Sequence, residues 1–90
     1  MPKRRDESEK KNLIGPTLQQ LRKRDNLSQR KLANKLQLAG LDIDKNVVTR
    51  IETGKRYVAD FELRMIAQFF GVSYDYLIDG DANGSSNKNR

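Results

Sequence analysis

The stretch DIDKNVVTRIETGKR, residues 42–56, combines an apolar and a polar face at helical spacing. Val48 and Ile51 lie three residues apart and predict the buried side of a short helix. Asp44 is a suitable N-cap for that helix, and Gly54 is a suitable terminator. We expect the opposite side of the helix to be exposed, and its residues are polar: Lys45, Asn46, Thr49 and Arg50.

Apolar residues at helical spacing predict four further helices around this one, and no segment has the alternating pattern of a strand. Ser28 and Ser73 are suitable N-caps for two of these helices. The helices are expected at about residues 14–25, 29–38, 45–53 and 60–71, with a short one after Ser73. The sequence therefore predicts an all-α domain of five helices.

The two ends of the chain are polar and lack apolar periodicity. We expect residues 1–12 to form a flexible arm, residues 13–80 the domain and residues 81–90 a flexible tail. The arm is charged but has no apolar stretch behind it, so we do not expect a secretory signal. No apolar run approaches the ~20 residues that a membrane-spanning helix needs.

The composition argues against catalysis and metal binding. The chain has no Cys and no His, so disulfides, thiolate metal sites and the commonest general base are all missing. We expect no enzyme activity, no cofactor and no metal. The net charge of +6 is uneven, because residues 13–41 carry +5 whereas residues 57–81 carry −4. A polyanionic partner would therefore meet the first two thirds of the chain.

Two helices joined by a turn, the second with a small polar face, predict a helix-turn-helix that binds duplex DNA. Such a helix fits the ~12 Å major groove. The amide of Asn46 matches the edge of adenine, whereas Lys45 and Arg50 can donate to guanine, and exposed Thr49 lies among them. The residues at both ends of this helix are suited to phosphate contacts: Ser28, Gln29, Lys55 and Arg56.

Three blocks of sequence carry a family resemblance: LSQRKLANKL (27–36), VVTRIETGKR (47–56) and LRMIAQFFGVSYDYL (63–77). With them, the chain from Ile14 to Leu77 resembles the Cro/C1-type (XRE-like) helix-turn-helix repressors of bacteria and phages. The resemblance implies a lambda-repressor-like fold and a transcriptional regulator, in most cases a repressor, that binds double-stranded DNA. It also implies a cytoplasmic location with the nucleoid.

The resemblance also implies roles for single residues. Gln29 matches a glutamine that contacts phosphate and braces the reading helix. Glu52 matches a glutamate that pairs with an arginine of the first helix, and Arg22 occupies the arginine's place here. We therefore assign Arg22 and Glu52 to a structural ion pair, with a phosphate contact as a second role for Arg22. Lys55 and Arg56 match positions that meet the DNA backbone.

The turn between the second and third helices departs from the family pattern. The family has one residue between the last leucine of the second helix and the hydrophobic residue before the third. Here six residues, 37–42, lie between Leu36 and Ile43. The turn is thus lengthened by about one helical turn plus a loop. We expect Leu38 and Leu41 to pack into the domain, which would preserve the angle between the two helices.

Phe61, Met65 and Phe69 recur every four residues on the side of their helix opposite to Leu63 and Phe70. One interpretation is a surface for a second copy, as in a homodimer on a near-palindromic site, or for a partner protein. The other is that the segment LQLAGL (36–41), Tyr57 or the last helix covers it. Two further functions remain open: an antitoxin that also binds a toxin, and a protein interaction module without DNA binding.

Overall fold

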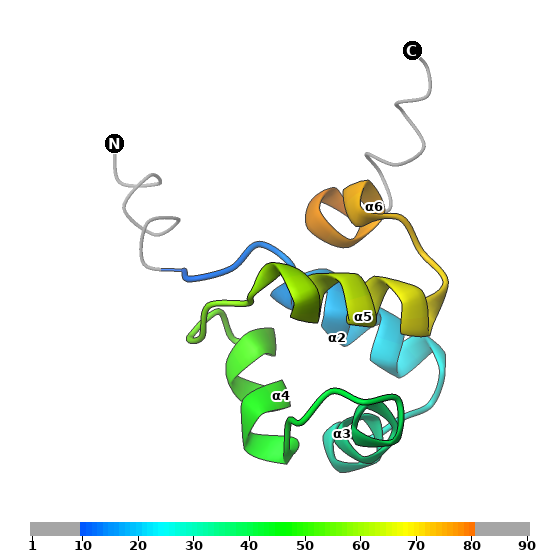
Figure 1. Cartoon of the computed structure of the whole chain (residues 1–90). Helices are drawn as coiled ribbons and strands as arrows, with labels where there is room; N and C mark the ends of the chain where they lie inside the picture. The colour runs from blue at the N-terminus through cyan, green and yellow to red at the C-terminus, as the bar shows by residue number, and fades with distance from the viewer. Residues whose placement is uncertain (1–9, 81–90) are drawn as a thin grey trace.

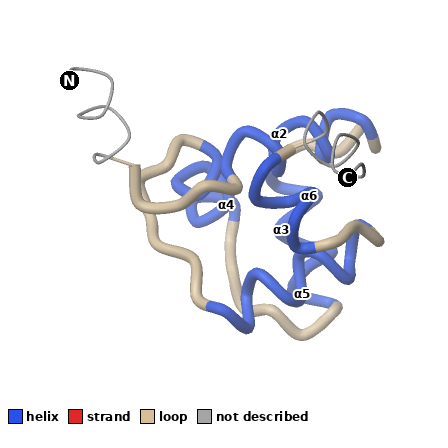
Figure 2. Tube along the Cα trace, turned by 90° about the horizontal axis from the view of Figure 1, so that it is seen from above, coloured by secondary structure: helices blue, strands red, loops and turns tan. Residues whose placement is uncertain are grey.

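The computed structural model describes residues 10–80, and that part consists of five helices without a strand (Figures 1 and 2). The all-α prediction is confirmed, and the predicted helix limits agree closely with the observed ones. None of these helices has the length and apolarity needed to cross a bilayer. The helices are α2 (Gly15–Arg24), α3 (Gln29–Leu38), α4 (Lys45–Glu52), α5 (Asp60–Phe70) and α6 (Tyr74–Asp79).

Every helix contributes a fully buried residue to one hydrophobic core. These residues, each at most 1% exposed, are Leu18 of α2, Leu32 of α3, Val48 of α4, Ile66 of α5 and Leu77 of α6. Figure 1 shows α3 and α4 together at one end of the molecule and α6 at the other, with α5 between them. The pair α3 and α4 therefore forms an end surface that the other helices support from behind.

The ends of α3 and α4 follow the predicted capping. The Ser28 hydroxyl oxygen accepts a hydrogen bond of 3.0 Å from the Lys31 backbone N–H, and the Asp44 carboxylate accepts one of 2.9 Å from the Val47 N–H. Each bond satisfies an N–H that the first turn of a helix leaves without a partner. These caps fix where both helices begin.

The N-cap position of α5 has no polar side chain of its own. Asp60 is the first residue of that helix, and Ala59 stands at the N-cap position. Because Ala59 has no capping side chain, Glu62 reaches back and its carboxylate accepts a hydrogen bond of 2.9 Å from the Ala59 N–H.

The N-terminal limit of the domain lies earlier than predicted. The Asn12 side-chain amide donates to the carbonyl oxygens of Ile51 (3.1 Å) and Arg56 (2.9 Å), and the Lys11 N–H donates to the Gly54 carbonyl (2.9 Å). The predicted arm, residues 1–12, is therefore too long at its inner end. Residues 1–9 and the predicted tail 81–90 lie outside the described residues.

Gly15 lets α2 approach α4 closely. A Cβ at Gly15 would lie 2.6 Å from the carbonyl oxygen of Ile51, a contact that only glycine avoids. The start of α2 thus rests directly on the backbone at the end of α4.

The lengthened connection between α3 and α4 is anchored by two apolar residues, whereas Leu38 at the end of α3 is not part of this anchor. Leu41 and Ile43 are each 3% exposed, whereas Leu38 is 88% exposed. The prediction that Leu38 packs inward was wrong, because Leu38 follows buried Leu36 by two residues and so points about 200° away from it on α3. The Gln37 side-chain amide also holds the connection, with a hydrogen bond of 2.6 Å to the Ile43 carbonyl.

Phe61, Met65 and Phe69 form a second apolar stripe on α5, and the rest of the domain covers only part of it. Phe61 is 60% exposed, whereas Met65 and Phe69 are half-buried against the core. The Phe69 ring meets Phe70 edge-on at 4.9 Å between centroids. Met65 lies beside the lengthened connection, since its Cε would be 3.5 Å from a Cβ at Gly40. The same chain therefore covers part of the stripe and leaves Phe61 outside.

Candidate nucleic-acid interface

The outward face of α4 carries side chains without partners. Asn46 and Arg50 are exposed, and within residues 10–80 neither side chain makes a hydrogen bond or ion pair. Val48 and Ile51 on the opposite side are buried at 0% and 1% exposure. The apolar side anchors the helix in the core, so the polar side presents an amide and a guanidinium to solvent from fixed backbone positions.

A chain of polar contacts fastens α4 to its neighbours. The Glu52 carboxylate accepts from Arg22 through Nε (2.6 Å) and Nη2 (3.0 Å), and it also accepts from the Gln29 amide (3.0 Å). The Thr49 hydroxyl donates to the Gln29 side-chain oxygen at 2.7 Å. The Glu52 side chain is only 1% exposed. Through it, this network joins α2, α3 and α4.

The network decides what some predicted site residues can do. Arg22 is predicted to pair with Glu52, and its third guanidinium nitrogen donates to the Leu27 carbonyl at 2.9 Å. With all three nitrogens engaged and a side chain 11% exposed, Arg22 has little left to offer a phosphate. Thr49 is half-buried, and its hydroxyl is committed to Gln29. Gln29 itself braces α4 against α3.

The other predicted phosphate contacts differ in availability. Lys55 is exposed, and within the described part of the chain its side chain has no hydrogen bond or ion pair. Ser28 is exposed but caps α3. Arg56 instead pairs with Glu62 through two hydrogen bonds of 2.9 and 3.1 Å. This guanidinium lowers the pKa of Glu62, with a smaller lowering from the Ala59 N–H, while burial opposes both.

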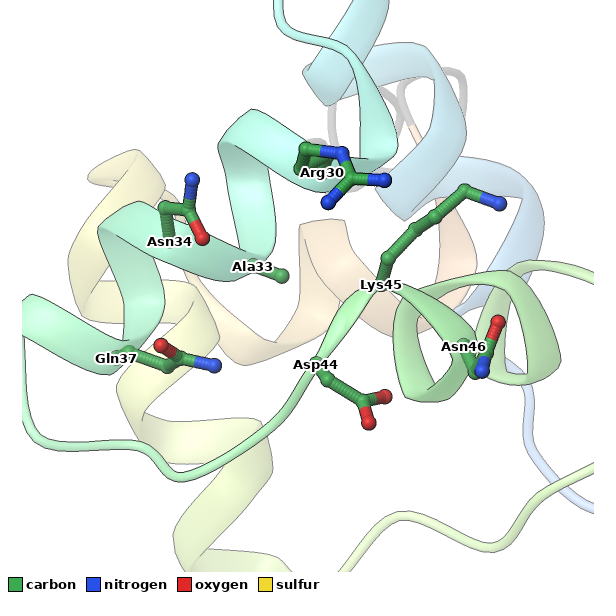
Figure 3. Close-up of a pocket in the computed structure, with 7 residues that line it drawn as sticks. All are labelled: Arg30, Ala33, Asn34, Gln37, Asp44, Lys45 and Asn46. Carbon is green, nitrogen blue, oxygen red and sulfur yellow. The ribbon is translucent and has the colours of Figure 1, made fainter.

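Lys45 lies at the start of α4, beside α3. It lines a pocket of about 380 Å³ between α3 and the start of α4 (Figure 3). Three polar residues of α3 that sequence reasoning missed also line this pocket: Arg30, Asn34 and Gln37. They recur four and three residues apart, so their shared face was readable from the sequence once α3 was expected. The remaining lining residues are Ala33, Asp44 and Asn46.

Residues 18–77 match the helix-turn-helix family HTH_3. The chain belongs to this family. Comparisons with curated proteins and with solved structures found no significant match. As an HTH_3 domain of the Cro/C1 (XRE-like) type, the protein is a DNA-binding transcription regulator, and the family is one of regulatory domains rather than enzymes. Within residues 10–80 no group of acidic side chains is arranged to hold a metal ion.

Proposed function

We propose that this HTH_3 protein is a repressor of bacterial or phage type that recognises a specific sequence in double-stranded DNA. The observation that carries the proposal is the outward face of α4, where Asn46 and Arg50 are exposed and unpartnered within the described residues. Buried Val48 and Ile51 and the Glu52 network hold that face still. Fixed donors and acceptors on a helix of this size are what base readout requires.

In the proposed complex, α4 enters the major groove and reads two kinds of base edge. The Asn46 amide would donate to and accept from one adenine, whereas the Arg50 guanidinium would donate to O6 and N7 of one guanine. Thr49 would stand beside them as a minor contact, since its hydroxyl already donates to Gln29. Each bidentate pair would discriminate against the wrong base by about 1–3 kcal/mol.

Contacts to the DNA backbone would set the register of α4. Ser28 and Gln29 at the start of α3 and Lys55 after α4 flank the reading face, and Lys55 supplies an unpaired cation. Arg56 would contribute less, because its guanidinium is engaged with Glu62. Occupancy of a site that overlaps a promoter would repress transcription in the cytoplasm, with the protein associated with the nucleoid.

The test is to enrich bound molecules from a pool of randomised duplexes and sequence them. The proposal predicts an enriched motif containing adenine and guanine positions within one half-site. If two chains bind a near-palindromic site, the half-sites should recur about one helical turn, ~34 Å, apart. Binding without any enriched motif, lost at moderate salt, would reduce the interaction to charge attraction and overturn the proposal.

The exposure of Phe61 favours a second candidate, an antitoxin or interaction role in which a protein binds beside α5. The Phe61 ring is 60% exposed, so it offers apolar surface that a protein partner would bury. Under this candidate Phe61→Glu would abolish a complex with a toxin encoded beside the gene, and DNA binding would persist. A pure interaction module would lack the enriched motif.

A further inference from the structure

The pocket between α3 and α4 lies beside the lengthened connection, whose last residue, Asp44, lines it. Residues 39–44 join the end of α3 to the start of α4, and the space of about 380 Å³ lies between the two helices beside this connection. Figure 3 shows Arg30 and Lys45 at one rim of the space and Asn34 and Gln37 at the opposite rim. Only one lining residue, Ala33, is apolar, so the space suits a polar ligand.

The charges of the rim favour an anion. Within residues 10–80 the side chains of Arg30 and Lys45 have no hydrogen bond or ion pair, and both are exposed. The Asn34 amide is a further free donor of this part of the chain. The carboxylate of Asp44 also lines the space, but one of its oxygens accepts from the Val47 N–H at 2.9 Å. Two cations against one carboxylate leave the rim net positive.

The pocket is continuous with the reading face, because Asn46 belongs to both. A DNA strand whose base meets Asn46 carries its phosphates on either side of that base. The neighbouring residues on α3 point elsewhere, since Lys31 is rotated by about 100° from Arg30 along the helix.

We propose that the α3–α4 pocket binds one phosphate of the DNA backbone, with Arg30 and Lys45 as its cations. The inference rests on the proposed function and deepens it. It assigns Arg30 to the interface and changes the role of Lys45 from reading a base to holding a phosphate. Loss of Lys45 should then weaken binding to all sequences alike, whereas loss of Asn46 or Arg50 should relax single base positions.

The test compares Arg30→Ala with Lys31→Ala on a duplex that carries the enriched motif. Both variants remove one exposed cation from adjacent positions of α3, but only Arg30 lines the pocket. The plot of log K against log salt has a negative slope. Its steepness should decrease by about 0.9 for Arg30→Ala and stay unchanged for Lys31→Ala. Arg30→Lys should retain the wild-type slope, which separates charge loss from any effect on folding. Equal slopes for Arg30→Ala and Lys31→Ala would overturn the inference.

A second pair of variants should act in the opposite direction. Asp44→Asn keeps a good N-cap for α4 but removes the carboxylate from the pocket. It should tighten DNA binding by up to about fivefold, the size of one unit-charge repulsion at contact distance in water. Asp42→Asn removes an exposed carboxylate of the same connection outside the pocket and should change affinity less. Equal gains from both variants would contradict a phosphate in the pocket.

The outcomes separate this inference from the proposed function. An enriched motif together with identical behaviour of Arg30→Ala and Lys31→Ala would remove the pocket contact and leave base reading by α4 intact. Failure to enrich any motif would overturn the proposed function but not the pocket contact, because a duplex bound by charge attraction still offers a phosphate. The salt slopes of Arg30→Ala and Lys31→Ala would then be compared on that duplex.

Discussion

At the scale of single residues, Glu52 contributes most to the position of α4. Its carboxylate accepts three hydrogen bonds, from Arg22 and Gln29, and is almost fully buried. The resemblance to the family suggested the pair with Arg22 and a bracing role for Gln29, but it did not give Glu52 as the group that Gln29 contacts. The sequence alone does not show how α3 packs against α4. The hydrogen bond from the Thr49 hydroxyl to Gln29 was therefore not predictable.

Removing the Glu52 carboxylate should destabilise the protein strongly. Glu52→Ala leaves the Arg22 guanidinium buried without its charge partner, so the free energy of unfolding should fall by about 3–5 kcal/mol. The double variant Arg22→Met with Glu52→Leu should lose much less, because it removes both charges and retains apolar volume. Urea unfolding monitored by circular dichroism measures both. A double variant that loses as much stability as Glu52→Ala would show that the pair does not act as a unit.

The pair of Arg56 and Glu62 should make stability depend on pH. The pKa of Glu62 is lowered in the folded state, first by the hydrogen bonds from Arg56, so ionised Glu62 stabilises the fold above the unfolded-state pKa. That contribution is lost as the pH falls through the folded-state pKa. The difference in free energy of unfolding between wild type and Glu62→Gln should thus be largest at neutral pH and shrink below about pH 4.5.

Unfolding curves at several pH values test this expectation. In an Arg56→Met background, much of the pH dependence of the Glu62→Gln difference should disappear, because the main cause of the lowered pKa is gone. A wild-type difference that stays constant from pH 7 to 3 would mean that the pair does not stabilise the folded state.

At the scale of elements, periodicity and capping residues were enough to predict all five helices. Ser28 and Asp44 cap the helices that their positions suggested. The connection between α3 and α4 was less predictable, because burial there depends on the direction in which α3 ends rather than on hydrophobicity. Leu38 and Leu41 are the same residue type, yet one is 88% and the other 3% exposed. The α3 face of the pocket was readable from the spacing of Arg30, Asn34 and Gln37, whereas its position opposite Lys45 depends on how α3 packs against α4.

The same two leucines test whether the connection is anchored. Leu41→Ala should lower the free energy of unfolding by about 2–5 kcal/mol, because it leaves a cavity in the core. Leu38→Ala, the matched control, should change stability by less than about 0.5 kcal/mol. Thermal or urea unfolding measures both. Similar losses for the two variants would contradict the burial of the connection.

At the scale of the whole molecule, the charge gradient and the division of the α5 stripe set how the domain can associate. The acidic last third includes α6, which lies at the end of the molecule opposite to α3 and α4 (Figure 1). A polyanion would therefore approach the end that carries the reading face. The sequence alone could not show which residues of the α5 stripe are covered, because the burial of Met65 depends on where the connection near Gly40 lies.

The divided stripe predicts different outcomes for two substitutions to glutamate. Phe69→Glu should destabilise the fold, since its ring packs against the core and meets Phe70 edge-on. Phe61→Glu should leave stability nearly unchanged, and if Phe61 mediates self-association it should convert a dimer to a monomer. Unfolding curves and sedimentation measure these two effects. A stable, folded Phe69→Glu variant would show that Phe69 belongs to the surface instead.

The measurement that most directly tests base reading by α4 is enrichment from randomised duplexes with the wild type and Arg50→Ala in parallel. Lys35→Ala, which removes an exposed cation of α3 outside the pocket, is the matched control. We predict that Arg50→Ala loses the preference for guanine at one position and keeps the rest of the motif, whereas Lys35→Ala yields the full wild-type motif. An unchanged motif from Arg50→Ala would contradict base reading by this face.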